Sequence, residues 1–316
     1  MCSVAAASLH SVQGRLSPPV FKKSGPAAPS RAGFDRRYNS WLSFYHFGWF
    51  PMQIAHLGWE DARRLDGCVF LVPLGSLEQH GLHLPLVTDT AIVSEISRRV
   101  EKSDPEGIVL LPALWLGHSP HHRRFACVSL DLRPYVEMIC GVCRSLVALG
   151  ARKILLLNGH GGNDVPCKAA LRELKSEFES RPDIYIAYAT YWSLAAREFG
   201  AIRTSPRGGM GHAGEMETSI MQAIHPEWVR IEKAAADGPY QEGPYRVADM
   251  LEPQPYHLVN EFDEISRTGA IGMPEYATRE KGEQFLKAAV DAVRTFIDEF
   301  RTWRYQESAA SNKKPE

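Results

Sequence analysis

A predominant charge and long apolar runs are both missing from this sequence of 316 residues. The 36 lysines and arginines nearly balance the 37 aspartates and glutamates, which leaves a formal net charge of −1. This balance gives no electrostatic basis for binding nucleic acid or an anionic membrane surface. The apolar runs also fall far short of the roughly 18 residues that a bilayer-spanning helix requires. We therefore expect a soluble protein with neither a nucleic-acid nor a membrane partner.

Cysteine spacing typical of a disulfide framework is also absent, although the chain has six cysteines. Cys140 and Cys143 have the CxxC spacing of redox and zinc motifs. They lie, however, in a segment whose apolar residues recur at helical spacing, which favours thiols that are buried as small hydrophobic groups. Reduced cysteines are typical of the cytoplasm, so we expect a cytoplasmic protein.

Nucleotide-binding motifs are missing as well, because neither G-x-G-x-x-G nor G-x-x-x-x-G-K-[ST] follows an expected strand. The sequence contains instead short apolar runs that alternate with segments of helical spacing. The expected strands are residues 69–74, 107–114, 153–157 and 184–189, and the expected helices are residues 90–102, 134–149, 165–179 and 279–303. Strands and helices in this alternation predict an α/β sandwich with a largely parallel sheet.

The two ends of the chain differ in composition from its centre. Residues 1–40 are rich in Ala, Ser, Pro and Arg, and we expect them to be a disordered N-terminal tail, either a targeting segment or an over-extended start. Residues 306–316 are expected to be a polar C-terminal tail. Residues 41–305 then form the functional domain, in which residues 231–262 are expected to make a long loop over the functional site.

Four groups able to bind metal follow the first expected strand within twelve positions: Glu78, His80, His83 and Asp89. Ligands bind at the carboxyl ends of strands in open α/β sheets. Carboxylate oxygens mixed with imidazole nitrogens suit divalent zinc, manganese or iron. A single such side chain on a loop is more often solvated, so the interpretation depends on partners elsewhere in the chain.

Two further clusters supply such partners. The segment NGHGGN places His160 among three glycines directly after the strand at 153–157, where the backbone can approach a ligand closely. The segment HAGEMETS carries His212, Glu215 and Glu217 after a glycine-rich approach. Three separate clusters of acids and imidazoles are difficult to explain by packing alone.

These motifs resemble the creatininase (creatinine amidohydrolase) family of dinuclear metal hydrolases. The matching pieces are PLGSLEQHGLHLPLVTDT, NGHGGN and HAGEMETS, with a weaker match in TGAIGMPEYATREKG, and they span about residues 70 to 282. The resemblance implies a three-layer α/β/α sandwich, two divalent metal ions and a small-molecule substrate. It also implies a homo-oligomer, which in the family is often a hexamer.

The resemblance assigns most of the metal ligands residue by residue. It implies that Asp89 bridges the two ions, that Glu78 and His160 complete one site, and that His80 belongs to the other. In creatininase itself a Glu at the position of Gly162 binds the second ion, and glycine cannot take this role. Other branches of the family share the His-Gly-Gly form and place a Glu at the position of Glu215. We therefore expect Glu215 to be the last ligand, with Glu217 as the alternative.

The remaining site residues are also implied by the resemblance. His212 fits proton transfer to a leaving nitrogen or stabilisation of an oxyanion, and the alternative is a His that only orients a ligand. Ser119, His122 and Trp192 are expected near the substrate, although Trp192 could equally be a core residue. The family's Pro-Gly-Thr turn after His122 is replaced here by Ala126-Cys127-Val128, which leaves the substrate and the subunit assembly open. Gly162, in place of the Glu of creatininase, makes creatinine an unexpected substrate.

The function expected from these residues is hydrolysis of a C–N bond, in a simple or cyclic amide, by metal-bound hydroxide attacking a polarised carbonyl. The same metal site could instead hydrolyse a C–C bond of a cyclic ketone, or a peptide bond. A third interpretation is a metal-binding protein without turnover, whose mark would be a ligand set filled entirely by protein.

Overall fold

The computed structural model describes residues 52–238, 241–242, 245–252 and 256–305. Both expected tails, residues 1–40 and 306–316, lie outside the described residues, as does the expected domain start near residue 41, and these boundaries stay predictions. None of the helices in the described part of the chain combines the length and the apolar character that a membrane span requires.

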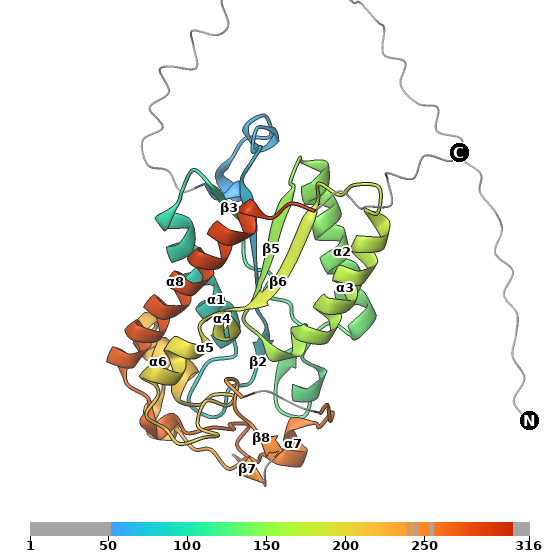
Figure 1. Ribbon diagram of the computed structural model, residues 1–316. Helices are drawn as coiled ribbons and strands as arrows, with labels where there is room; N and C mark the ends of the chain where they lie inside the picture. The colour runs from blue at the N-terminus through green and yellow to red at the C-terminus, as the bar shows by residue number, and fades with distance from the viewer. Residues whose placement is uncertain (1–51, 239–240, 243–244, 253–255, 306–316) are drawn as a thin grey trace, which may run out of the picture. The chain divides into compact units, whose positions relative to one another are not determined.

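A parallel four-stranded sheet forms the centre of the domain (Figure 1). Its order is β3-β1-β5-β6, with β1 at Val69–Leu74, β3 at Ile108–Leu110, β5 at Lys153–Asn158 and β6 at Tyr185–Thr190. All residues of β1 and β5 are buried, as expected for central strands that are covered on both faces. The four predicted strands are confirmed, although β3 is shorter than residues 107–114, because Pro112 has no N–H to continue the ladder.

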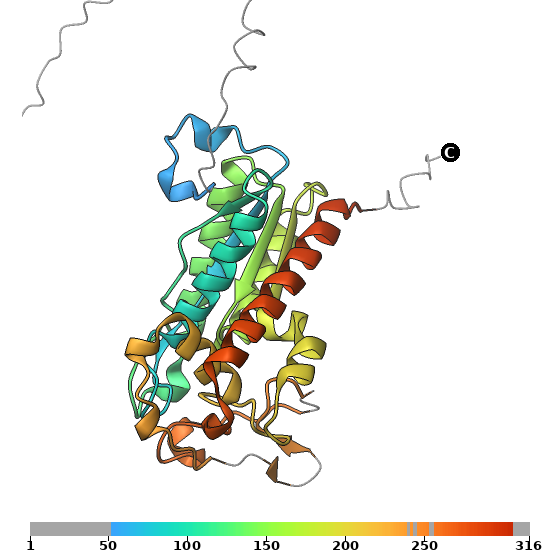
Figure 2. The same cartoon turned by 90° about the vertical axis from the view of Figure 1, so that its left-hand side faces the viewer.

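Helices cover both faces of this sheet, which confirms the three-layer α/β/α sandwich (Figures 1 and 2). One face packs against α1, α6 and α8, and the other packs against α2 and α3. The bounds of these helices are Thr88–Ser103 for α1, Leu132–Ala148 for α2, Asp164–Glu177 for α3, Glu215–Ile224 for α6 and Arg279–Thr302 for α8. Cys140 and Cys143 are buried on the inner face of α2, as the helical apolar spacing predicted.

The helix α8 crosses α6 closely, and this contact sets the position of α6. A Cβ on Gly282 would lie 2.0 Å from the carbonyl oxygen of Ser219, so only glycine permits this approach. The shorter helices α4 (Tyr191–Leu194) and α5 (Ala196–Ile202) follow β6 and also contact α8. The start of α6 is thereby held beside the carboxyl ends of the strands.

Short elements gather at this end of the sheet (Figure 1). The strand β2 (Leu77–Glu78) pairs antiparallel with β4 (Cys127–Val128), and the short strands β7 (Gln241–Glu242) and β8 (Arg246–Val247) form a second antiparallel pair. The segment that we expected as a long loop over the site, residues 231–262, leads into the one-turn helix α7 (Phe262–Ile265). This helix contacts the 3₁₀ turn at Pro120–His122.

The topology identifies where a ligand should bind. The chain leaves β1 through α1 toward β3 on one side, and it leaves β5 through α3 toward β6 on the other, while Leu74 and Asn158 end their strands opposite each other. Connections that diverge from adjacent parallel strands leave a crevice beyond their carboxyl ends, where ligands bind in open α/β sheets. The loops after β1 and β5 carry the first two predicted clusters.

Candidate metal centre

Backbone contacts after the end of β1 fix the position of Glu78 in β2. A Cβ on Gly75 would lie 2.3 Å from Oγ1 of Thr90, so glycine lets the end of β1 pass directly against α1. The Thr90 hydroxyl donates a hydrogen bond of 2.8 Å to the carbonyl oxygen of Ser76. Glu78 then pairs with Cys127 across the β2–β4 ladder, and the residue is 1% exposed. Its buried position is therefore set by backbone contacts on two sides.

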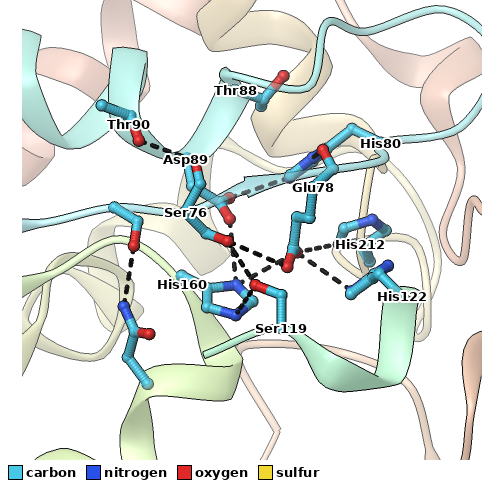
Figure 3. Close-up of polar contacts among 12 residues, drawn as sticks. Ser76, Glu78, His80, Thr88, Asp89, Thr90, Ser119, His122, His160 and His212 are labelled. Atoms are coloured by element: carbon cyan, nitrogen blue, oxygen red, sulfur yellow. Dashed lines mark hydrogen bonds and ion pairs between the residues drawn. The ribbon is translucent and has the colours of Figure 1, made fainter. Parts of the chain in front are cut away.

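Asp89 lies in the first turn of α1 and turns its two carboxylate oxygens toward two different imidazoles (Figure 3). Its Oδ1 is 2.9 Å from Nε2 of His80, and its Oδ2 is 3.1 Å from Nδ1 of His160. The Oδ2 atom is buried but lacks a hydrogen bond of good alignment. A carboxylate with one oxygen on each side is the arrangement that a bridging metal ligand requires.

Two triads of potential ligands share this carboxylate. Glu78, Asp89 and His160 bring their ligand atoms within 4.8 Å of one another, and Oε1 of Glu78 is 3.2 Å from Nδ1 of His160. On the other side His80 and Asp89 form a second triad with Glu217, whose Oε2 is 3.9 Å from Nε2 of His80. The structure thus brings together four of the five predicted ligands, from β2, the loop after it, α1 and the loop after β5.

The structure does not bring Glu215 into this cluster, contrary to our expectation. Its carboxylate accepts hydrogen bonds from the backbone N–H groups of Thr204 and Ser205, at 3.0 and 2.9 Å, and forms an ion pair of 2.7 Å with Lys281. Successive helical residues are rotated by about 100°, so Glu215 and Glu217 lie on opposite sides of the first turn of α6. The sequence did not show which of the two acids faces the cluster, and in the structure Glu217 does.

Neighbouring groups orient the two ligand imidazoles. Nδ1 of His80 lies 3.1 Å from the backbone carbonyl oxygen of Glu78, which directs Nε2 toward Asp89. Nε2 of His160 lies 3.1 Å from both Oγ of Ser119 and the carbonyl oxygen of His118, which directs Nδ1 into the cluster. Such partners fix the ring orientation of metal-binding histidines. Ser119, which we predicted near the substrate, is fully buried and contacts His160, and its role toward a substrate stays a prediction.

Charge in the cluster is balanced between carboxylates and imidazoles. Burial alone would lower the pKa of His80, but Asp89 outweighs it and raises this pKa to about 10. Burial also opposes ionisation of Glu78, yet the charge of His160 holds the Glu78 pKa well below its ordinary value. Burial raises the pKa of Glu217 to about 7, although His80 opposes this shift. Each of these groups therefore depends on a neighbouring charge to stay ionised.

The donor set fits divalent metal ions. In the described residues Glu78, Asp89 and Glu217 form no ion pair with a lysine or arginine, so histidines are the only ionisable basic groups paired with these three buried carboxylates. Buried carboxylates are costly unless they are paired or bind a metal. Mixed imidazole and carboxylate ligands suit zinc, manganese or iron. The cluster can therefore hold metal through groups that have no other strong cationic partner.

His212 and His122 border the cluster on the Glu78 side (Figure 3). Nδ1 of His212 is 3.9 Å from Oε1 of Glu78, and Nε2 of His122 is 3.2 Å from the same oxygen. Burial, together with repulsion from His80, holds the pKa of His212 well below its ordinary value. A neutral imidazole therefore lies beside the two triads, where we expected His212.

Two predicted residues lie away from the cluster. Trp192 packs in the apolar core, where its ring meets that of Tyr191 edge-on at 5.0 Å, which agrees with the core alternative. His83 is buried, and its Nε2 lies 3.0 Å from Oγ1 of Thr218, in the helix that carries Glu217.

Sequence reasoning did not single out three residues that border the cluster. Gln79 contacts His122 through its side-chain amide and His212 through its backbone carbonyl. The ring of Phe262 stacks on that of His122 with centroids 4.0 Å apart, and the ring of His121 lies parallel to that of His160 at 5.8 Å. Gln79 stands inside a quoted motif and His121 stands beside His122, so both could have been noticed. Phe262 reaches the site only through the tertiary fold.

Comparisons with known proteins identify the family to which this chain belongs. The profile of the family described as Creatininase: Creatinine amidohydrolase matches residues 55–297. The creatinine amidohydrolase of Pseudomonas putida is 27% identical over 263 residues, which cover 78% of this chain and 96% of that protein. The mycofactocin precursor peptide peptidase of Mycobacterium tuberculosis (strain ATCC 25618 / H37Rv) is 31% identical over 230 residues, 70% of this chain and 81% of that protein.

Among solved structures, the crystal structure of a creatinine amidohydrolase (creatininase) matches with a TM-score of 0.64 and 24% identity. The match covers 80% of this chain and 99% of that one, and it shows that the two share a fold. The family profile spans most of the described residues, including every member of the two triads. The chain therefore belongs to the creatininase family of hydrolases.

Proposed function

We propose that the protein is a dinuclear metal-dependent hydrolase that cleaves the C–N bond of an amide. The observation that carries this proposal is Asp89, which lies between two triads and presents one oxygen to each. Glu78 and His160 would hold one ion, and His80 and Glu217 would hold the other. When bound, a pair of divalent cations lowers the pKa of water and polarises a carbonyl group, which is the chemistry that amide hydrolysis needs.

The surrounding residues of the chain would support this chemistry by orientation and by exclusion of water. Ser119 and the His118 carbonyl keep His160 in its position, and the Phe262 ring covers one face of His122. All three carboxylates are buried away from water, where the effective dielectric constant is lower and every charge interaction in the cluster is stronger. His212 remains neutral beside Glu78, where an imidazole can take up or deliver a proton during breakdown of a tetrahedral intermediate.

The two named relatives favour a C–N bond over a C–C bond. An amidohydrolase and a peptide peptidase are both described by hydrolysis at a carbonyl carbon that carries nitrogen. Gly162 argues against creatinine itself, because the Glu of creatininase at this position has no counterpart here. A Cβ at Gly162 would lie 2.2 Å from the His118 carbonyl oxygen and 2.4 Å from Nε2 of His160. The contacts that orient His160 thus occupy the space where that side chain would begin.

Two further proposals concern the state of the protein. The five cysteines in the described part of the chain are free thiols, and this supports a reducing compartment such as the cytoplasm. We also propose a homo-oligomer, on the basis of the family resemblance alone.

Metal analysis of the purified protein tests the function first. We expect two equivalents of zinc, manganese or iron per chain, loss of both in Asp89→Ala, and loss of one in Glu78→Ala. Full metal content in both variants would refute the metal centre. A panel of simple amides, cyclic amides, peptides and cyclic diketones then tests the bond. Turnover confined to the diketones would move the reaction to a C–C bond, and a fully loaded protein without any turnover would favour a binding role.

A further inference from the structure

Gln79 lies between two proposed ligands, and its side-chain amide has an unambiguous orientation. Its Oε1 accepts a hydrogen bond of 2.8 Å from the backbone N–H of Gly81, a group that can only donate. Its Nε2 donates a hydrogen bond of 2.9 Å to the carbonyl oxygen of Gly269, a group that can only accept. These two backbone partners fix both ends of the amide. The second N–H of the amide remains for another acceptor.

That acceptor is Nδ1 of His122, which lies 2.9 Å from Nε2 of Gln79. A neutral imidazole carries a proton on one nitrogen and a lone pair on the other. Because Nδ1 accepts from the amide, the ring proton of His122 must be on Nε2. This N–H group faces Glu78 at 3.2 Å, and it is buried without a hydrogen bond of good alignment (Figure 3).

The same residue also fixes the ring of His212. Nε2 of His212 lies 2.8 Å from the backbone carbonyl oxygen of Gln79, and a carbonyl oxygen can only accept. The amide nitrogen of Gln79 is farther from this atom, at 3.3 Å, and its two hydrogens are already shared with Gly269 and His122. His212 therefore turns the lone pair of Nδ1 toward Glu78, whereas His122 turns an N–H group toward the same carboxylate.

On the basis of the proposed hydrolase function, we infer that Nε2–H of His122 donates a hydrogen bond to the carbonyl oxygen of the substrate. Gln79 is the positioning residue that keeps the proton on this atom. A ring that carries Nε2–H has no lone pair to offer a metal ion there, so His122 is not a ligand despite its proximity to Glu78. A fixed donor aimed at a carbonyl oxygen stabilises the negative charge that develops on it.

The proton position can be read without any substrate. Zinc-loaded protein labelled with ¹⁵N-histidine is measured by NMR, and the His122 signals are assigned by their loss in His122→Gln. We expect Nε2 to be protonated and Nδ1 to show a pyridine-type shift. A proton on Nδ1, or a zinc-shifted Nε2 signal, would overturn the inference even if the protein binds two ions. Failure to bind zinc would instead count against the proposed function.

Substitution of Gln79 tests its role as the positioning residue. Glutamate offers only acceptor oxygens, so Gln79→Glu is expected to place a proton on Nδ1 of His122 and remove the pyridine-type signal. Gln284→Glu, the same change on an exposed position of α8, is the control and should leave the His122 signals unchanged. An unchanged His122 spectrum in Gln79→Glu would contradict the assignment. The wild-type spectrum decides the matter if that variant does not fold.

A pair of variants connects the donor to catalysis. His122→Met removes the donor and is expected to lower kcat by about 10²–10³-fold, the effect of losing one donor to an oxyanion. The amide NH₂ of His122→Gln can occupy nearly the same place, so this variant should retain most of that activity. Zinc content should be equal in both proteins. Equal activity of the two variants would refute the donor role.

Discussion

Exchanging the two acids of α6 for glutamine, one at a time, separates metal binding from stability. Glu217→Gln removes a carboxylate that lies 3.9 Å from His80 and belongs to the second triad. Contacts outside the ligand set typically change metal affinity by about 10–100-fold. Loss of a ligand itself should exceed that range for one ion. We expect this variant to retain the ion held by Glu78 and His160 and to lose the other on dialysis.

Glu215→Gln is the matched control, because it makes the same chemical change two residues away. It breaks an ion pair between a fully buried carboxylate and Lys281, whose side chain is 15% exposed. Breaking a buried pair costs about 3–5 kcal/mol, and the partial exposure of Lys281 places this case near 3 kcal/mol. At about 2–4 °C per kcal/mol for a domain of this size, the Tm should fall by roughly 6–12 °C. Both metal ions should remain.

Metal content by mass spectrometry and Tm by calorimetry distinguish these outcomes, with metal added in excess before dialysis. The expected result is one ion lost with little change of the metal-free Tm in Glu217→Gln, and two ions retained with a lower Tm in Glu215→Gln. The reverse pattern would show that Glu215 is the ligand, as the sequence first suggested. Loss of the same ion from both variants would refute the separation of roles that the two sides of α6 imply.

Two other predictions follow from the site. Gly162→Ala should impair binding of the ion at Glu78 and His160, because the added Cβ would lie 2.2 Å from the His118 carbonyl oxygen. Gly161→Ala is the control, because a Cβ there meets nothing within 4 Å, and this variant should bind metal normally. Equal metal titrations of the two variants would contradict this prediction. Zinc affinity should rise with pH up to about 10, and more steeply below about pH 7, because the ion must displace a proton from His80 below about pH 10 and also from Glu217 below about pH 7. In metal-free protein, the raised pKa of His80 contributes stability that is fully present below about pH 6.5 and is lost as pH rises through about 10. Denaturant titrations across this range would check the sign, and a stability that rose with pH would contradict it.

The sheet and its covering helices could be predicted from the sequence because their apolar patterns are long and regular. The helix predicted at 134–149 is α2 within two residues at its start and one at its end, and its cysteines are buried as the spacing indicated. The strand predicted at 107–114 was too long. Its residues beyond Leu110 still hydrogen-bond to β1, through Leu111 and Leu114, but without regular ladder geometry around Pro112.

The motifs predicted four side chains of the cluster, and they did not predict which acid of α6 joins them. Glu78, His80 and His160 follow expected strands and Asp89 directly precedes an expected helix, so their convergence could be expected. The choice between Glu215 and Glu217 depended on how the first turn of α6 is rotated against α8. Lys281 pairs with Glu215, and Gly282 permits the close approach of α8 to α6, and both residues lie far along the chain from this turn. Phe262 is a similar case, since only tertiary contacts bring it over His122.

The shared position of Asp89 has a consequence for how the protein matures. The groups around it come from positions between 78 and 217, so the full set of ligands is assembled only when β1, β5 and α6 are packed together. Contacts between segments this far apart in sequence must first offset the entropy of closing a long loop. Metal bound by the full set of ligands would therefore stabilise the assembled domain by mass action and would leave the unfolded chain unaffected, so scarcity of metal would lower the stability of the finished protein.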